Sequence, residues 1–269
     1  MFARAFSVAY RIPWVKRLLW REWYQFLALR YRQDRWTFMN YGYRPIDAAP
    51  LALASEDEPD RSCIELYDLV AQGIDLSGRE VLEIGSGRGG GASFVARYHS
   101  PHRMVGVDLS PRAVALCRER HSVPGLSFEV GDAESLGFAS ASFDAVLNVE
   151  SSHCYGDLDA FLREVRRMLR PGGHFLYADF RSRTEVEAWR AKLLAMGLTL
   201  VSERNITPGV VAALDADDES KRGLIRSYVD RPLVRLFGQF AALRGSTLYN
   251  EFRGGAVEYR AFVFQKDGA

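Results

Sequence analysis

A glycine-rich segment at residues 81–91, VLEIGSGRGGG, carries the clearest chemical signal in this sequence. It predicts a strand that ends in a flexible turn, after which GGASFVARYH begins a helix. Gly85, Gly87 and Gly90 fit the pattern G-x-G-x-x-G, in which the backbone of the turn can approach a ligand closely. Taken alone, the pattern indicates only a nucleotide-like ligand.

Glu83 distinguishes between the possible ligands, because it precedes the first glycine by two residues. A carboxylate at the end of this strand would repel a pyrophosphate and would favour a ligand that carries a positive charge. The amino group and the sulfonium of S-adenosylmethionine are charges of this kind. The alternative is a partly exposed carboxylate in an ordinary tight turn.

Two further acidic residues follow predicted strands and extend this pattern to a nucleoside. Asp108 ends the strand in VGVDLS, where an ionised carboxylate can accept hydrogen bonds from both ribose hydroxyls. Asp132, in GDAESLGF, follows the next strand, where a carboxylate can accept a hydrogen bond from the amino group of adenine. The alternatives are a capping role for Asp108, before the helix start at Ser110, and a free turn residue for Asp132.

A polar cluster at residues 148–155 follows the fourth predicted strand, in FDAVLNVESSHCY. It lies beside the predicted switch point, where open α/β sheets bind ligands, so we expect the chemistry here. His153 is the candidate general base, and Glu150 is the candidate group that orients or polarises it. The alternative for His153 is a helix cap or a pocket-lining position. The later segment LRPGGHFLYADF predicts a helix end, a turn and a strand with an architectural role.

An alternation of strands and helices must position these residues. Apolar runs predict strands at 80–84, 103–107, 126–130, 143–148 and 174–179, with helices at about 90–99, 111–121 and 157–169 between them. Right-handed crossovers then give a parallel sheet whose strands end at one edge. A helix at 184–197 follows, and two last strands at 198–206 and 257–265 can pair antiparallel at the side of the sheet.

The rest of the chain predicts additions to this core. A helical stretch within 207–245 precedes the last strand and predicts a cap that faces the substrate. The domain bounds that we expect are 1–56 for an N-terminal lid or oligomerisation segment, 57–204 for the core, 205–245 for the cap and 246–269 for the final strand of the core.

The N-terminal 36 residues are basic and aromatic, with eight arginines or lysines against two acidic residues. Residues 15–32 place apolar side chains at helical spacing, which predicts an amphipathic basic helix. Such a helix can act as a lid, contact another subunit or lie on an anionic membrane, and an ordinary docking helix is the alternative. We expect a homo-oligomer that forms through this helix.

Composition excludes several classes of protein. The net charge is +1, so no overall field favours nucleic acid. Three scattered cysteines provide neither a disulfide framework nor a zinc site, and no metal-spaced cluster is visible, so we expect a cytoplasmic protein without a metal. No apolar run approaches the roughly 20 residues that span a bilayer.

The motifs VLEIGSGRGG, VGVDLS, GDAESLGF with SFDAVLNVES, and LRPGGHFLYADF together resemble the class I S-adenosylmethionine-dependent methyltransferases. NVESSHCY, GGGASF and SEDEPDR resemble more closely the bacterial phthiotriol and phenolphthiotriol dimycocerosate O-methyltransferases and related natural-product enzymes. The resemblance implies an α/β, Rossmann-like fold with seven strands in the order 3-2-1-4-5-7-6 and strand 7 antiparallel. The N-terminal helical extension and the helical cap would be added to it.

The same resemblance implies contacts with S-adenosylmethionine, whose product is S-adenosylhomocysteine. Glu83, Gly85 and Gly87 would contact the methionine part and Asp108 the ribose. Asp132 with Ala133 would contact the adenine. The further implied cofactor contacts are Leu109, Asn148 and Tyr41, of which Tyr41 would close over the cofactor.

The function that we expect is methyl transfer to a hydroxyl of a hydrophobic natural product or lipid. A methyltransferase of the same fold that acts on carbon or nitrogen, such as a prenyl alkene or an electron-rich ring, is the main alternative. An NAD-type oxidoreductase or a domain that binds the cofactor without turnover is a further one. Glu83 argues against the oxidoreductase, and the cluster at 148–155 argues against a domain without turnover.

Overall fold

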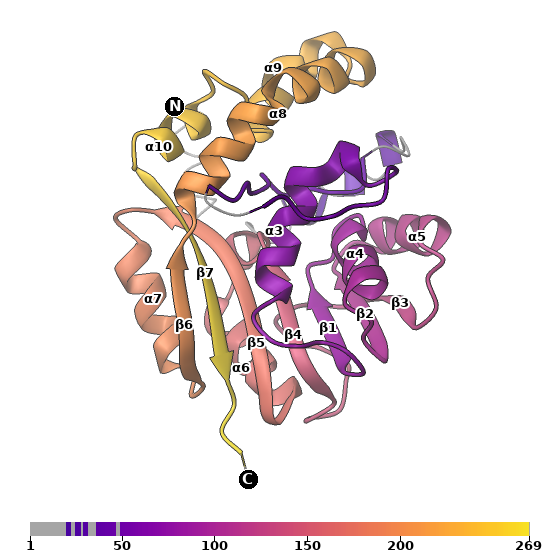
Figure 1. Ribbon diagram of the computed structural model, residues 1–269, viewed down its shortest axis with the longest axis vertical. Helices are drawn as coiled ribbons and strands as arrows, with labels where there is room; N and C mark the ends of the chain where they lie inside the picture. Colours follow the sequence, from indigo (N-terminus) through magenta and orange to yellow (C-terminus); the bar gives the residue numbers. More distant parts are fainter. Residues whose placement is uncertain (1–19, 23–24, 28, 32–35, 47–48, 269) are drawn as a thin grey trace.

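Seven strands form one sheet in the order β3-β2-β1-β4-β5-β7-β6, as the computed structural model shows (Figure 1). The strands are β1 (Glu80–Ile84), β2 (Arg103–Asp108), β3 (Leu126–Val130), β4 (Phe143–Val149), β5 (Leu169–Ser182), β6 (Thr199–Asn205) and β7 (Val257–Gln265). β7 pairs antiparallel with both β5 and β6, whereas the other pairs are parallel. This confirms the predicted fold class and strand order.

Helices cover both faces of the sheet and one of its edges. They are η1 (Glu58–Asp60), α3 (Arg61–Ala71), α4 (Gly90–Tyr98), α5 (Pro111–Arg120), η2 (Ser152–Cys154), α6 (Leu158–Met168), α7 (Val186–Ala195), α8 (Thr207–Tyr228), η3 (Arg231–Leu233), α9 (Val234–Phe240) and α10 (Thr247–Arg253). The structure describes residues 20–22, 25–27, 29–31, 36–46 and 49–268. Within the range predicted as the N-terminal helix, the described residues are helical except Tyr31, and the rest of that prediction lies outside the described residues.

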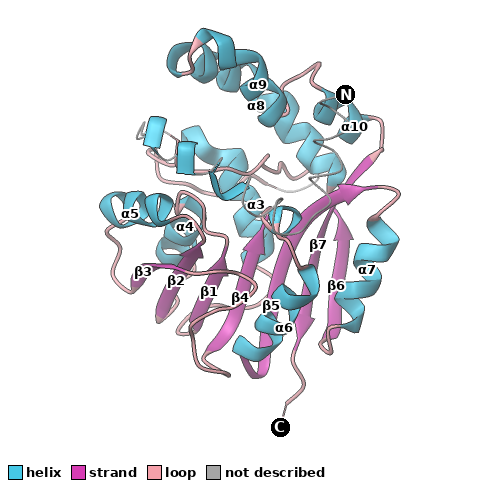
Figure 2. Cartoon of the chain, turned by 180° about the vertical axis from the view of Figure 1, so that it is seen from behind, coloured by secondary structure: helices cyan, strands magenta, loops and turns pink. Residues whose placement is uncertain are grey.

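The two faces of the sheet explain why neighbouring residues of its strands can both be apolar. Val81 packs in the core under α3 and α4, whereas its neighbour Leu82 packs in the core under α6 and α7. Figure 2 shows α6 and α7 on this second face. Because a strand points successive side chains to opposite faces, a sheet covered on both sides needs apolar residues at every position.

One predicted turn is part of a strand instead. β5 begins at Leu169, where it pairs with Phe143, and its next pair with β4 joins His174 to Ala145. Residues 170–173, which include the Pro-Gly-Gly sequence, therefore bulge out of the ladder. Gly172 has a φ of +75°, and its N–H donates to the carbonyl oxygen of Lys266 at 2.9 Å. The glycine supplies the left-handed conformation that this bulge requires.

Three helices, α8, α9 and α10, lie between β6 and β7 and rise above the carboxyl edge of the sheet (Figure 1). The helical region thus extends to Arg253, beyond the end expected at residue 245. Among the helices of the described residues, none combines the length and apolar character that a membrane crossing requires.

Candidate active site

A cavity of about 940 Å³ opens at the carboxyl edge of the sheet, above β1, β2 and β4. Seven of the predicted site residues line it, and these are Gly85, Gly87, Asp108, Leu109, Asp132, Ala133 and Glu150. The chain segment at 37–40 closes the cavity from the side opposite the sheet. The other predicted residues, Glu83, Asn148, Tyr41 and His153, lie around this cavity and not on its lining.

The turn after β1 is shaped by its glycines and fixed by Asp108. Gly85 has a φ of +80°, and a Cβ at this position would lie 2.3 Å from Oγ of Ser151. The carboxylate of Asp108 accepts the N–H groups of Gly87 and Ser110, each at 2.9 Å. Ser110 itself caps α5 through its hydroxyl, so Asp108 is not the side-chain cap of this helix. Burial raises the pKa of Asp108 to about 6.

Glu83 is fully buried beneath the turn and has one oxygen to spare. The hydroxyl of Tyr67 donates to Oε1 at 2.7 Å, while Oε2 makes no hydrogen bond with the described residues. Tyr67 reaches this position because Gly91 has no side chain, and a Cβ there would lie 2.0 Å from the tyrosine ring. Burial raises the pKa of Glu83 to about 7, against the lowering effect of Tyr67. A buried acceptor without a donor fits a cationic amino group of a ligand.

Asn148 supports the turn from behind. Its Nδ2 lies within hydrogen-bond distance of the carbonyl oxygen of Ile84 at 2.8 Å, Oγ of Ser151 at 2.7 Å and the hydroxyl of Tyr155 at 2.9 Å. Asn148 is fully buried and lies outside the cavity lining. The structure therefore places it behind the ligand-facing layer, where it ties the end of β4 to the end of β1.

Asp132 and Ala133 form the wall of the cavity beyond β3. Oδ1 of Asp132 accepts the N–H of Glu134 at 3.1 Å, which makes this residue the start of a tight turn. Ala133 is buried beside it, and both residues line the cavity. Asp132 therefore starts a turn and also lines the cavity, and its contact with adenine stays a prediction.

His153 is held by a carboxylate that the sequence analysis did not single out. Its Nδ1 lies 2.9 Å from Oδ1 of Asp179, and its backbone N–H donates to Oδ2 of Asp179 at 3.0 Å. Asp179 is fully buried at the end of β5 and also pairs with Arg181 at 3.2 Å. The ring of His153 lies 4.5 Å from that of Phe180 and 5.9 Å from that of Trp20, which lines the cavity. Asp179, and not Glu150, is thus the carboxylate bonded to His153.

The electrostatics of this pair favour the charged form of His153. Burial opposes protonation, but Cys154 and Asp179 outweigh it and raise the pKa of His153 to about 10. Burial likewise opposes ionisation of Asp179, but Arg181 and His153 hold its pKa below the usual range of a carboxyl group. A cation and an anion therefore face each other beside the cavity at neutral pH.

Glu150 lines the cavity in a strained backbone conformation, with a φ of +51°. Its Oε2 accepts the backbone N–H of Tyr41 at 3.0 Å and the hydroxyl of Tyr259 at 3.1 Å. Burial raises its pKa to about 8, whereas Tyr41 and the charge of His153 lower it. Non-glycine residues in this region of backbone space concentrate at functional sites.

A second cavity of about 1400 Å³ adjoins the first and lies under α8 and α9. Phe38, Met39 and Asn40 line both cavities, so the segment that carries them stands between the two. Tyr41 lines the second cavity, with its ring 5.6 Å from that of Phe180. Residues 37–40 line the first cavity, whereas Tyr41 does not, and its closure over a cofactor stays a prediction.

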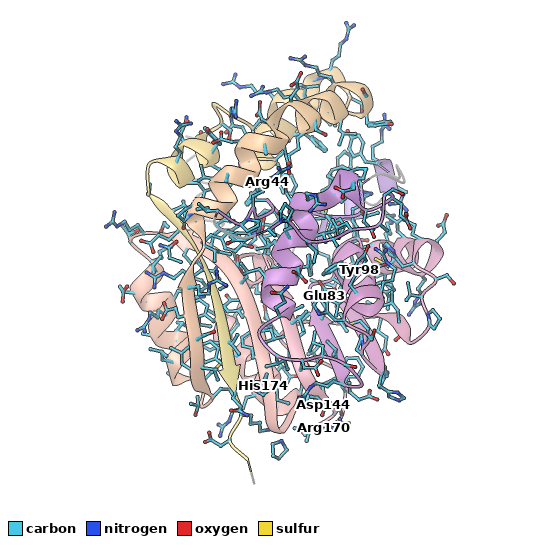
Figure 3. The ribbon with its side chains drawn as sticks, viewed as in Figure 1. Arg44, Glu83, Tyr98, Asp144, Arg170 and His174 are labelled. Carbon is cyan, nitrogen blue, oxygen red and sulfur yellow. The ribbon has the colours of Figure 1, made fainter. Side chains whose placement is uncertain are left out.

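Figure 3 shows how charged side chains are distributed along the sheet. Glu83 lies at the end of β1 that faces the cavity, and Arg44 lies above it beside α8 (Figure 3). Asp144, Arg170 and His174 lie at the opposite edge, where Arg170 pairs with Asp144 at 2.9 Å. This second group of charged and polar side chains is remote from both cavities.

Three residues of the site were missed by the reading of the sequence. Arg88, in the glycine-rich segment, lines the cavity, donates to the carbonyl oxygen of Tyr31 and lies 4.7 Å from the ring of Trp36. The other two are Tyr67 and Asp179. Only Asp179 had a signal, because it is a polar residue at the carboxyl end of the apolar run FLYA.

The order of the strands, the buried carboxylate below a glycine turn and the acidic ends of β2 and β3 define an S-adenosylmethionine-dependent methyltransferase. Comparison with known proteins agrees. Residues 82–177 match the family model described as a methyltransferase domain.

The chain is 40% identical over 249 residues to the phthiotriol/phenolphthiotriol dimycocerosates methyltransferase of Mycobacterium tuberculosis (strain ATCC 25618 / H37Rv), covering 93% of this chain and 92% of the relative. It belongs to this family of S-adenosylmethionine-dependent methyltransferases. It is also 40% identical over 245 residues to the fatty-acid O-methyltransferase of Mycolicibacterium smegmatis (strain ATCC 700084 / mc(2)155), covering 90% of this chain and 88% of the relative.

Solved structures share the fold at lower identity. The [4+2]-cyclase SpnF has a TM-score of 0.73 at 21% identity, covering 93% of this chain and 95% of its own. A geranyl diphosphate methyltransferase in complex with S-adenosylmethionine has a TM-score of 0.62 at 17% identity, covering 86% of this chain and 99% of its own. These two likenesses concern the architecture and not the acceptor.

Proposed function

We propose that this enzyme transfers the methyl group of S-adenosylmethionine to a hydroxyl oxygen of an uncharged, hydrophobic small molecule or lipid. The observation that carries the proposal is the second cavity, which adjoins the cofactor cavity and is large and mainly apolar. Aromatic and aliphatic side chains dominate its lining, among them Trp36, Phe237, Phe240, Leu224 and Ile225. A concave and mainly apolar site fits a hydrophobic ligand.

The charged residues of this cavity balance one another, which supports an uncharged acceptor. Arg44 lies 3.5 Å from Asp217, and Lys221 lies 3.8 Å from the other oxygen of the same carboxylate. Asp60, which also lines the cavity, accepts the hydroxyl of Thr37 at 3.0 Å. With two basic and two acidic side chains on the described lining, a carboxylate or a diphosphate would find no net positive charge.

The glycine turn and the acids around it would hold the methyl donor. Glu83 offers its spare oxygen to the amino group, Asp108 accepts from the ribose, and Asp132 with Ala133 faces the adenine. S-adenosylmethionine supplies an electrophilic methyl group on its sulfonium. Positioning the acceptor oxygen in line with that methyl can supply about 7–11 kcal/mol of the barrier, so we expect it to be the main catalytic effect.

The acceptor's proton would leave toward Glu150. Glu150 lines the cavity, and with a pKa near 8 it is about one tenth ionised at pH 7, a fraction that grows as the pH rises. His153 is charged at neutral pH and stabilises the ionised form of Glu150. We therefore assign the base to Glu150 and the polarising charge to His153, which exchanges the roles expected from the sequence.

A direct test measures transfer from methyl-labelled S-adenosylmethionine to a panel of acceptors. The panel contains a long-chain secondary alcohol, a hydrophobic phenol, a fatty acid of equal length and a prenyl diphosphate. We expect methylation of the alcohol or the phenol at saturating donor. Turnover of the prenyl diphosphate alone would favour the carbon-methylating alternative, and turnover of the fatty acid alone would overturn the uncharged acceptor.

A cytoplasmic location and a homo-oligomer formed through residues 15–32 stay predictions. Light scattering of the full chain at several concentrations gives its mass in solution. A monomer at all concentrations would contradict the predicted oligomer.

A further inference from the structure

The outer end of the cap carries exposed apolar side chains at the mouth of the second cavity. Leu224 and Tyr228 are 38% and 45% exposed, and both also line the cavity. Leu236 on α9 is 49% exposed. Figure 1 shows that α9 and the end of α8 project furthest above the sheet. An apolar path thus leads from the cavity to the surface.

Three arginines on the same part of the cap, on α8, η3 and α9, have no acidic partners among the described residues. Arg226, Arg231 and Arg235 are exposed, and none of them forms an ion pair with the described residues. Asp230, which precedes Arg231, is already paired, since it lies 2.9 Å from Arg30. We call Leu224, Arg226, Tyr228, Arg231, Arg235 and Leu236 the outer cap surface.

We propose that the outer cap surface docks on an anionic lipid bilayer, so that a hydrophobic acceptor passes from the bilayer into the second cavity. The passage of an acceptor into the cavity rests on the proposed function. The binding to a bilayer does not, and it can be tested without an acceptor. Arginines beside anionic headgroups are attracted to the negative surface potential, and leucine and tyrosine side chains partition into the interface.

Charge favours a bilayer over a second copy of the chain as the occupant. In a symmetric contact each copy presents the same patch, so two sets of unpaired arginines would meet. Like charges brought together at an interface oppose association. An anionic bilayer instead supplies the missing counter-charge to all three arginines at once.

The test measures sedimentation of the full chain with vesicles of phosphatidylglycerol and phosphatidylcholine, without any methyl acceptor. We expect binding at low salt and its loss in 1 M salt or with phosphatidylcholine alone, because salt screens exposed charges. The triple variant Arg226→Gln, Arg231→Gln, Arg235→Gln should bind on the order of 100-fold more weakly. Leu236→Ser should also weaken binding at low salt, because it removes an apolar side chain from the surface.

A matched control replaces three exposed arginines that lie outside the cap, with Arg112→Gln, Arg163→Gln and Arg204→Gln. It changes the net charge equally and should bind as the unchanged chain does. Absence of binding to anionic vesicles, equal losses in the two triple variants, or unchanged binding of the outer cap variant would each overturn the proposal. A dimer in light scattering that Leu236→Ser dissociates, without vesicle binding, would assign the surface to a second copy. Failure to methylate any acceptor, with vesicle binding intact, would count against the proposed function alone.

Discussion

Glu83 lies where a single buried carboxylate can select a cationic ligand. One of its oxygens is bonded to Tyr67, and the other has no partner among the described residues. Because its pKa lies near 7, its charge changes within the physiological range. Ligand binding at this site should therefore depend on pH.

Glu83→Gln should weaken the binding of S-adenosylmethionine about 10- to 100-fold, since a hydrogen bond to a charged group contributes about 1.5–3 kcal/mol. In the unchanged enzyme the affinity should rise as pH increases through 7, because Glu83 becomes ionised, and in the variant this rise should disappear. Titration calorimetry from pH 6 to 8.5 measures both effects. Glu80→Gln, on the same strand but at its other end, is the control and should bind normally. Equal affinities for Glu83→Gln and the unchanged enzyme would show that Glu83 does not contact the donor.

Glu150 and His153 can be separated by the pH dependence of turnover. If Glu150 is the base, kcat should rise with pH to a plateau with a midpoint near 8, and Glu150→Gln should lower kcat about 10²- to 10⁴-fold. His153→Gln should keep most of the plateau rate but move the midpoint to higher pH, because it removes the positive charge that favours ionised Glu150.

Steady-state rates at saturating donor and acceptor test this, with donor binding measured separately to confirm that each variant is folded. Near-normal turnover of Glu150→Gln together with loss of turnover in His153→Gln would restore His153 as the base.

The start of α4 is the element on which the donor site depends. Gly91 allows α3 to approach so closely that Tyr67 reaches Glu83. Gly90 permits a similar contact with the segment at 37–40, because a Cβ there would lie 2.6 Å from the carbonyl oxygen of Thr37. α3 and the segment at 37–40 can thus approach α4 closely because Gly91 and Gly90 have no side chains.

Gly91→Ala should destabilise the protein by about 1–3 kcal/mol, because the added methyl overlaps the ring of Tyr67 and forces it to shift. Donor binding should weaken as well, since Glu83 loses its partner. Gly223→Ala is the control, because this glycine is also helical but a methyl group added to it would have no neighbour within 4 Å. It should leave stability equal or increase it by up to about 1 kcal/mol. Chemical denaturation of both variants compares them, and equal stabilities would contradict the packing argument.

At the scale of the whole molecule, the buried acidic groups make stability depend on pH. Burial raises the pKa values of Asp108, Glu83 and Glu150 to about 6, 7 and 8. A group whose folded pKa is raised contributes stability that is complete below its unfolded pKa and is lost as pH rises through the folded value. The ligand-free enzyme should therefore become less stable between about pH 4 and pH 8.

Thermal unfolding without ligand should show a Tm that falls over this range. Glu150→Gln should reduce the slope near pH 8, because it removes the group with the highest of the three pKa values. Saturating S-adenosylmethionine should raise Tm most at the alkaline end, where Glu83 is ionised and in need of a cation. A ligand-free Tm that rises with pH throughout this range would contradict these assignments.

The sequence by itself determined the core fold and most of the residues that line the first cavity at the ends of the strands. Val81 and Leu82 are consecutive apolar residues in the strand, which indicates a strand covered on both faces. The glycine turn, Asp108 and Asp132 each follow such a strand. Because parallel strands end at one edge, these local signals were enough to bring the donor residues together.

Only the tertiary structure decided the partners of His153 and Glu150 and the shape of the second cavity. His153 meets Asp179 across 26 positions, and Glu150 meets Tyr41 across 109. The second cavity joins residues near the start of the chain, such as Trp36, to α8 and α9. Periodicity and motif spacing report local conformation and burial, whereas these contacts depend on how the segment at 36–44 and the cap pack over the sheet edge. No pattern within one segment specifies that packing, because the packing energy depends on the residues of both segments in contact.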